Sequence, residues 1–188
     1  MDEAVANHAL LGNQLWQDGL EEATEAGARM RSEVGSRIQA AKVREFNTLG
    51  VILGYRYENS PIIVGDGSEP PTRDFRNYVP SAHPGCLAPH AWLADGSSLY
   101  DHFGQGFTLL ITGDVAPEDV DRAREAARTV TIPLTIAKPD VREIADLYQA
   151  RYALIRPDQH VAWRADELPK QTAKLFEMLA GRGPSDRQ

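Results

Sequence analysis

A short apolar segment near the middle of the chain constrains the fold more than any other feature. The stretch from Pro84 to Gly113 mixes turn residues with apolar residues, and Ala-Asp-Gly-Ser at 94–97 separates two apolar patches. This pattern predicts a hairpin that leads into a buried strand at 107–111. Because the backbone groups of a buried strand must be paired, the elements that follow this strand decide the fold.

The segments after residue 111 alternate regularly between helical and strand patterns. Pro117 and the acids behind it mark the start of one helix, and Asp140 is expected to cap another. The expected elements are a helix at 116–128, a strand at 132–137, a helix at 141–149, strands at 152–156 and 160–164, and a helix at 169–180. The resulting order β-α-β-α-β-β-α is typical of an α/β thioredoxin-like domain.

The N-terminal part of the chain has a different character. The first 18 residues show roughly helical spacing, and residues 20–47 predict a long amphipathic helix with Met30, Val34 and Ile38 on one stripe. An apolar stripe of this kind needs a surface to cover it. Residues 49–64 are rich in β-branched and aromatic side chains and predict two short strands.

Prolines and charges between the two parts indicate a connector. We therefore predict a helical and strand appendage at 1–64, a Pro-rich connector at 65–80, the α/β domain at 81–182 and a tail at 183–188.

The charge balance excludes several classes of partner. The chain carries 27 acidic and 20 basic residues, a net charge of −7, which disfavours a nucleic-acid-binding surface. No apolar run approaches the roughly 20 residues needed to span a bilayer. The acidic N-terminus does not have the pattern of a secretory signal, so a cytoplasmic location and no membrane partner are expected.

Redox chemistry by a dithiol is not expected. A thioredoxin-like domain that acts on thiols places its nucleophile at the start of the first helix, but residues 112–117 contain no cysteine. Arg151 precedes the third strand, where such domains usually have a proline. The single cysteine, Cys86, is expected to be a buried apolar residue.

Other catalytic patterns are weak in this sequence. The five histidines do not form the spacing of a metal site, and no phosphate-binding glycine motif follows a strand. His83 and His90 flank a Pro-Gly turn, where a structural role is favoured over a functional one, and His160 is expected to be solvated. Asp95 and Asp101 are close in sequence, but Asp95 suits a turn better than catalysis. We predict no catalytic, cofactor-binding or metal-binding residue in the chain.

Tyr55, Arg56 and Tyr57 alternate aromatic and basic side chains along a predicted strand. They could line a pocket for an aromatic acid. The favoured alternative packs both tyrosines on the long helix and pairs Arg56 with an acid on it.

Several segments together resemble one known protein family. They are Phe46–Gly50, Leu53–Pro61, Pro84–Leu93 with Ala88-Pro89-His90, Leu99–Asp101, Gly106–Leu110 and Leu154–Arg164. In this order they resemble the C-terminal third of flavin-dependent aromatic hydroxylases, which include phenol, chlorophenol and hydroxyphenylpropionate monooxygenases and polyketide hydroxylases. The resemblance covers roughly residues 30–168. Leu87 departs from the family pattern, which often has arginine there.

The resemblance implies a parent enzyme that uses FAD and NAD(P)H to hydroxylate phenolic or other aromatic substrates. It also implies that residues 1–64 are the end of the catalytic body and that the thioredoxin-like domain lacks a dithiol. The flavin motifs of the family have no matching positions in this chain. We therefore expect a C-terminal fragment with a structural or interfacial role that binds neither FAD nor NAD(P)H by itself. Its expected partners are the FAD and substrate domain of the parent chain and a second copy of itself.

Two alternatives stay open at this point. The chain could be a free-standing thioredoxin-like interaction or dimerisation module without catalytic activity. A peroxidase of the peroxiredoxin kind is suggested by Ala88-Pro89-His90 and the later Asp95-Gly96, but the required Thr and Cys after the first strand are absent.

Overall fold

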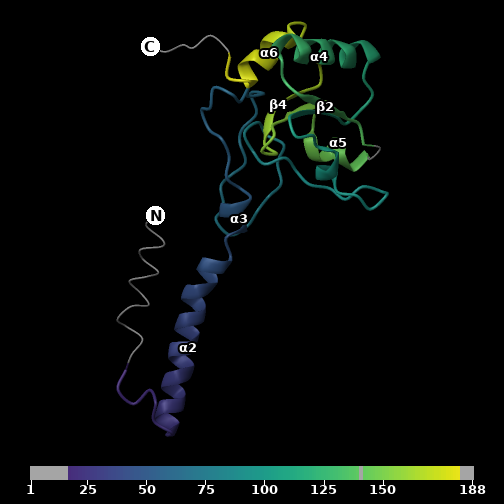
Figure 1. Cartoon of the computed structure of the whole chain (residues 1–188). Helices are drawn as coiled ribbons and strands as arrows, with labels where there is room; N and C mark the ends of the chain where they lie inside the picture. Colours follow the sequence, from purple (N-terminus) through teal and green to yellow (C-terminus); the bar gives the residue numbers. More distant parts are fainter. Residues whose placement is uncertain (1–16, 140–141, 183–188) are drawn as a thin grey trace, which may run out of the picture. The chain divides into compact units, whose positions relative to one another are not determined.

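The computed structural model describes residues 17–139 and 142–182 (Figure 1). The chain divides into two compact units. The first contains the described residues up to Ile52 together with Asp74–Tyr78, and the second contains Leu53–Arg73 and the described residues from Val79 onward. These divisions differ from the predicted boundaries, because residues 53–73 group with the α/β domain.

The first unit is built around helix α2, Glu25–Phe46. Thr24 caps the helix, and its side chain accepts a hydrogen bond from the Gly27 amide at 3.1 Å. Arg31 ties the preceding turn to the helix by donating to the carbonyls of Leu20 and Glu22. The helix begins after the predicted position because Thr24 caps it there by accepting from the Gly27 amide. The expected helix within the first 18 residues falls almost entirely outside the described residues.

A short helix α3, Leu49–Ile52, lies where the sequence predicts a strand. Gly50 explains the difference, because a Cβ at this position would overlap the carbonyl oxygen of Asp74. The helix therefore approaches another backbone segment more closely than a side chain permits. This contact is made far along the chain, so the local preference of Val51 and Ile52 for strands does not decide the conformation.

The second unit contains a four-stranded sheet in the order β2-β1-β3-β4. The strands are β1 Phe107–Ile111, β2 Leu134–Ala137, β3 Tyr152–Ile155 and β4 Val161–Ala165. Strands β1 and β2 are parallel, whereas β3 is antiparallel to both of its neighbours. The element order along the chain, β1-α4-β2-α5-β3-β4-α6, is the predicted one.

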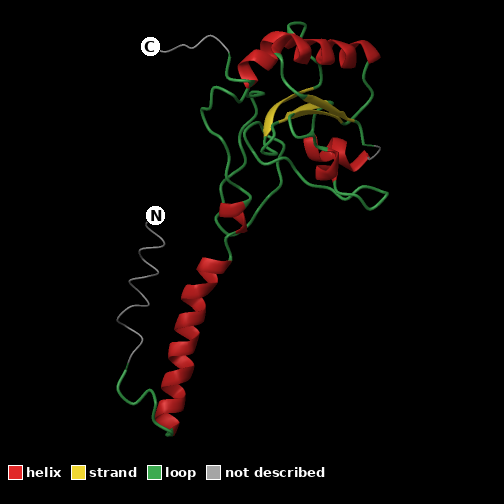
Figure 2. Ribbon diagram, in the orientation of Figure 1, coloured by secondary structure: helices red, strands yellow, loops and turns green. Residues whose placement is uncertain are grey.

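Helices cover both faces of this sheet (Figure 2). Helices α4, Pro117–Val130, and α6, Thr172–Leu179, lie on one face, and α5, Arg142–Tyr148, lies on the other. The first face buries Leu109, Ile111 and Phe176 in one apolar cluster. The second face buries Leu110, Ile144 and Tyr148, together with Leu99 from the short 3-10 helix η1, Leu99–His102. The sheet is therefore buried on both sides, as its nearly continuous apolar strands require.

Local differences from the predicted elements are small in this unit. Helix α6 starts at Thr172 rather than near Pro169, whose carbonyl accepts a hydrogen bond from the Thr172 hydroxyl. The β3–β4 hairpin contains an irregularity between Leu154 and Ile155. The predicted cap Asp140 lies outside the described residues.

Residues 53–73 pass beside the outer strand β4 without forming a named strand. Arg56 makes a single antiparallel bridge with Cys86, and the Val64 amide donates to the Ala162 carbonyl at 2.9 Å. Asn59, with a φ of 52°, and Pro61 interrupt the extended backbone between these contacts. The second predicted strand of 49–64 is therefore replaced by isolated bonds to the domain.

Candidate functional site

The turn between β1 and α4 is the place where a thioredoxin-like domain carries its thiol chemistry. The Thr112 amide donates to the Arg151 carbonyl at 3.1 Å, and the Thr112 hydroxyl donates to the Ala150 carbonyl at 2.5 Å. A Cβ on Gly113 would lie 3.3 Å from Cγ of Arg151. The turn at 112–117 and the residues before β3 therefore meet, as in a thiol-active domain, but neither segment contributes a cysteine.

The first turn of α4 is acidic rather than anion-binding. Its cap, Ala116, offers no side-chain hydrogen bond, and Glu118 and Asp119 follow directly. The Tyr152 hydroxyl donates to Asp119 Oδ2 at 2.7 Å. Burial and this hydrogen bond to a carboxylate raise the pKa of Tyr152 to about 12. Because carboxylates here would repel a pyrophosphate, this helix start does not fit FAD.

Cys86 lies away from the β1–α4 turn and is not arranged for reaction. Its residue is 8% exposed, its amide donates to the His83 carbonyl, and its carbonyl accepts from the Val161 amide. Burial raises the pKa of the thiol, which opposes formation of a reactive thiolate. The prediction of a buried small residue is confirmed.

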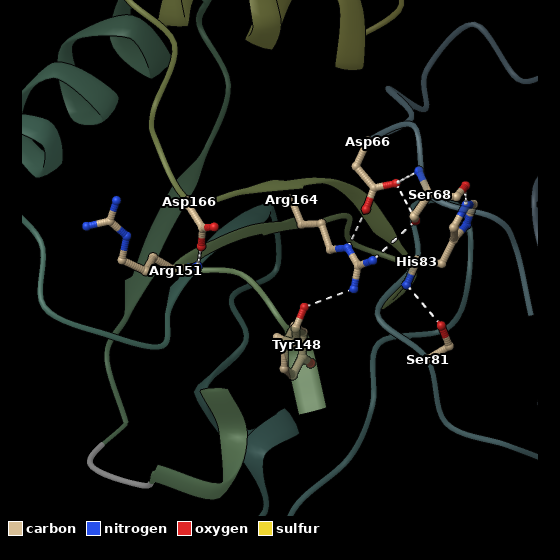
Figure 3. A network of polar contacts seen from close by, with 8 residues as sticks. All are labelled: Asp66, Ser68, Ser81, His83, Tyr148, Arg151, Arg164 and Asp166. Carbon is tan, nitrogen blue, oxygen red and sulfur yellow. Dashed lines mark hydrogen bonds and ion pairs between the residues drawn. The ribbon is translucent and has the colours of Figure 1, made fainter. Parts of the chain in front are cut away.

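A network of polar contacts centres on Arg164 of strand β4 (Figure 3). Its Nε donates to Asp66 Oδ2 at 2.6 Å, one Nη donates to the Tyr148 carbonyl at 3.0 Å, and the other lies 3.3 Å from Ser68 Oγ. The side chains of Arg164 and Asp66 are only 10% and 15% exposed. This largely buried ion pair fastens residues 66–68 to the sheet.

Asp66 is held in its ionised form by this arrangement. Burial raises the pKa of its carboxyl, but hydrogen bonds from Ser68 and Arg164 outweigh that effect and lower the pKa to about 2. His83 extends the network, because its Nε2 lies 3.2 Å from the Ser68 carbonyl. The hydrogen-bonded, structural role expected for His83 agrees with this position.

A second polar cluster surrounds the β3–β4 turn. Arg156 donates to both carboxylate oxygens of Asp158 at 3.1 and 2.9 Å, and the Tyr57 hydroxyl donates to Asp158 at 2.9 Å. The Arg156 guanidinium also lies 4.9 Å from the centre of the Tyr57 ring, within the range of a cation–π contact. Burial raises the pKa of Asp158, but the bonds from Arg156 and Tyr57 lower it overall.

The expectation that His160 is solvated is wrong. The residue is 1% exposed, and its ring lies 4.8 Å from that of Tyr55 and 5.0 Å from that of Tyr57. Its Nδ1 lies 2.9 Å from the Asp158 carbonyl. Residues 53–57 cover the turn that carries His160, which the pattern of the hairpin alone does not show.

Arg56 also differs from its favoured interpretation. Its partner is Glu58, with Nη2 2.7 Å from Oε1, and not an acid of the long helix. Arg73 binds the other oxygen of Glu58 at 3.0 Å, and Arg56 donates to the Pro71 carbonyl at 2.6 Å. Hydrogen bonding from Arg56 lowers the pKa of Glu58. These bonds fold residues 56–73 into a compact loop.

A pocket of about 420 Å³ lies against this loop and includes Arg56, Glu58, His83 and Pro84 in its lining. Arg56 is paired with Glu58 in this pocket, so its charge is already balanced. The bonds of Arg56 beside this pocket attach the loop to itself through Glu58 and Pro71.

The residues near the predicted hairpin at 84–113 have structural partners. Asp95 accepts hydrogen bonds from the amide and hydroxyl of Ser97 at 2.9 and 2.6 Å, which confirms its turn role. Asp101 and Ser98 form a capping box at the start of η1. His90 Nε2 lies 3.0 Å from the Ser98 hydroxyl. Within residues 17–139 and 142–182, no group of His, Cys, Asp and Glu side chains could hold a metal ion.

The sequence interpretation did not single out Arg164, Arg156 and Asp66. A usable signal was present, since Arg164 interrupts an otherwise apolar strand and a buried arginine needs a partner. The identity of that partner, 98 residues away, depends on the folded structure.

Three comparisons with known proteins agree on the family. Residues 81–181 match the family model described as aromatic-ring hydroxylase, C-terminal. The FAD-dependent monooxygenase apdD of Emericella nidulans is 33% identical in an alignment over 153 residues, and the match covers 78% of this chain and 24% of that protein. Phenol 2-monooxygenase of a Pseudomonas species is 31% identical in an alignment over 175 residues, and the match covers 82% of this chain and 28% of that protein.

Solved structures show the same relationship. The rebeccamycin biosynthetic enzyme RebC with reduced flavin matches 97% of this chain and 34% of its own, with 33% identity and a TM-score of 0.80. The flavin-dependent monooxygenase PieE, in complex with FAD and substrate, matches 88% of this chain and 31% of its own, with 32% identity and a TM-score of 0.63.

The chain spans about a quarter to a third of the length of these relatives. The match over residues 81–181 and the agreement of the solved structures identify the part of these relatives to which the chain corresponds. This chain belongs to the aromatic-ring hydroxylase family, of which it carries the C-terminal domain.

Proposed function

We propose that the chain is the C-terminal part of an FAD- and NAD(P)H-dependent monooxygenase that hydroxylates phenolic or other aromatic substrates. The relatives named above support this proposal, since they include FAD-dependent monooxygenases and a phenol 2-monooxygenase. The flavin, once reduced, supplies the oxygen chemistry in such enzymes. The FAD and substrate domains are partners outside these 188 residues.

Within the parent enzyme, this part has a structural and interfacial role. The observation that carries the proposal is the attachment of residues 53–73 to the sheet through the Arg164–Asp66 pair and the Tyr57–Asp158 bond. Most polar groups of the site are used in these internal bonds. Such an arrangement holds a segment in place.

The domain from 81 to 182 is, in this proposal, thioredoxin-like and without dithiol activity. The sheet order β2-β1-β3-β4, with parallel β1 and β2 joined by α4, supports that layout. The turn at 112–117 supports the loss of redox chemistry, because Cys86 lies elsewhere and its thiol pKa is raised by burial.

Two further predictions concern location and self-association. A cytoplasmic location stays a prediction from the sequence. In the described part of the chain no helix is both long and apolar enough to cross a membrane. A second copy of the chain is proposed as an additional partner.

The test is to purify the 188-residue chain and to supply FAD, NADH or NADPH, and phenol. We expect a colourless protein that neither retains flavin after gel filtration nor oxidises the nicotinamide. The same chain joined to the FAD and substrate domain of a relative should be yellow and should consume the nicotinamide when phenol is added. Flavin retained by the isolated chain would contradict the proposed role, and a colourless, inactive fusion would contradict the proposed family activity.

A further inference from the structure

The first unit carries most of the exposed large apolar side chains of the described residues. Seven of the ten such side chains belong to it, although it is the smaller of the two units. Six of the seven lie on the last turn of α2, on α3 and on the segment that packs against α3. These six, which we call the α2–α3 patch, are Val43, Phe46, Leu49, Val51, Ile52 and Phe75. Apolar side chains that gather on a surface in this way mark an interaction site.

Helical spacing places the patch side chains on common faces. Val43 and Phe46 are three residues apart on the last turn of α2, and Leu49 and Ile52 have the same spacing on α3. Residues three apart are neighbours on a helix surface. Helix α3 also packs against the backbone of the segment that carries Phe75. The chain therefore collects these side chains at one end of α2.

Among its described residues, the first unit has no second layer that could cover the patch. Helices α2 and α3 are the only helices or strands in this part of the chain. Val34, from the stripe predicted from the sequence, is only 6% exposed, whereas Phe46 is 80% exposed. Helices in proteins are stabilised mainly by packing of an apolar face, and a domain needs two packed layers. The patch therefore needs a partner from outside the unit.

The described residues of the second unit do not provide a matching surface. Their apolar side chains are gathered in the two clusters on the faces of the sheet. Only Tyr55, Val79 and Trp92 are large apolar side chains exposed in this part of the chain. A few exposed residues of this kind are normal on any protein surface. A partner with a larger apolar area is required.

We infer that the α2–α3 patch docks on an apolar surface of the flavin- and substrate-binding body of the parent enzyme. RebC matches 97% of this chain, so the match extends over the first unit, but this chain covers only 34% of RebC. The family model of the C-terminal domain begins at residue 81, so the described first unit precedes that domain. Relatives of this kind therefore carry the counterpart of the patch together with a much larger body in one chain.

Covalent attachment favours this occupant over a second copy. A body in the same chain as the patch is present at an effective concentration on the order of millimolar. A second copy competes only when the protein itself reaches a comparable concentration. The body should therefore cover the patch first.

Thiol reactivity at the patch tests this docking, which rests on the proposed function for its occupant. Phe46→Cys in a Cys86→Ala background places a new thiol in the patch. In the chain fused to the FAD and substrate domain of a relative, this thiol should be modified at least about tenfold more slowly than in the 188-residue chain. Mass spectrometry of the labelled peptide measures both rates. Equal rates in a fusion that retains flavin would overturn the inference.

Trp92 provides the matched control, because it is 70% exposed and lies in the second unit. The thiol of Trp92→Cys, in the same background, should react equally fast in the fusion and in the 188-residue chain. In the fusion that carries Phe46→Cys, Leu49→Asp places a charge in the patch and should restore fast modification of the new thiol. Trp92→Asp should leave modification slow. A thiol that stays protected despite Leu49→Asp would contradict docking through the patch.

Protein concentration separates the two occupants. In the 188-residue chain, the modification rate of Phe46→Cys should not depend on the concentration of the chain. A rate that falls as the concentration rises would assign the patch to a second copy and overturn the inference.

Failure of the docking and failure of the proposed function give different results. A fusion that retains flavin and consumes the nicotinamide with phenol, but leaves the new thiol reactive, contradicts only the docking. A fusion that retains flavin and protects the thiol, but consumes no nicotinamide, supports the docking and contradicts only the proposed activity.

Discussion

Nε of Arg164 lies 2.6 Å from Oδ2 of Asp66 and joins two residues that are 98 positions apart in the chain. Both side chains are largely buried, and the same guanidinium also donates to the Tyr148 carbonyl. This relationship links strand β4, the end of α5 and the 53–73 loop. The stability of the loop should therefore depend on it.

Replacing one partner of this pair should be costly. Arg164→Met leaves Asp66 partly buried without its cation, and such a loss typically costs on the order of 3 kcal/mol. Urea unfolding measures the change in the free energy of unfolding. The control is Arg128→Ala, which breaks an exposed pair with Glu125 and should cost less than about 1 kcal/mol. Equal effects of the two substitutions would show that the buried pair does not hold the loop.

The Asp66 carboxyl should make stability depend on pH in a defined window. Its pKa is lowered from 3.8 to about 2 in the folded chain, so the ionised form is favoured by folding. The stabilisation is present above pH 4 and is lost as pH falls through the folded pKa near 2. The shift corresponds to about 2 kcal/mol.

This pH effect is checked by urea unfolding at a series of pH values between 5 and 2 for the wild type and for Asp66→Asn. The variant should be less stable at pH 5, and the difference between the two proteins should shrink as the pH approaches 2. A constant difference across that range would assign the effect to other carboxyl groups.

Cys86 should be protected from thiol reagents in the native chain. The residue is buried and the pKa of its thiol is raised, so both access and thiolate formation are limited. We expect a disulfide reagent to modify Cys86 at least about tenfold more slowly in the folded chain than in urea. Cys86→Ala gives the blank for this measurement. Modification at the same rate in both states would mean that the thiol is open to solvent.

Two glycines of the first unit give a matched pair of substitutions. Gly50→Ala places a methyl group against the Asp74 carbonyl, whereas Gly35, inside α2, has no heavy atom within 4 Å of an added Cβ. Gly50→Ala should lower the thermal unfolding midpoint. Gly35→Ala should raise helix stability by about 0.5–1 kcal/mol. Circular dichroism melts of both variants measure these effects, and a neutral result for Gly50→Ala would rule out the close backbone approach.

The sequence by itself determined the order of elements from β1 to α6 and the absence of a cysteine in the β1–α4 turn. These features depend on local periodicity, on turn chemistry at positions such as Pro117, and on residue identity, all of which are visible without the fold. The six segments that resemble aromatic hydroxylases also depend only on residue identity, and the family comparison confirms that resemblance.

The tertiary structure decided the rest, because the deciding contacts join residues far apart in the chain. Residues 49–52 form a helix because Gly50 packs against the Asp74 carbonyl. His160 is buried beside the rings of Tyr55 and Tyr57. Arg164 forms an ion pair with Asp66. The strand propensities of different residue types span only about 1 kcal/mol, so burial and ion pairing of larger magnitude override them. A single sequence shows which side chains need partners, and the folded chain alone shows which partners they have.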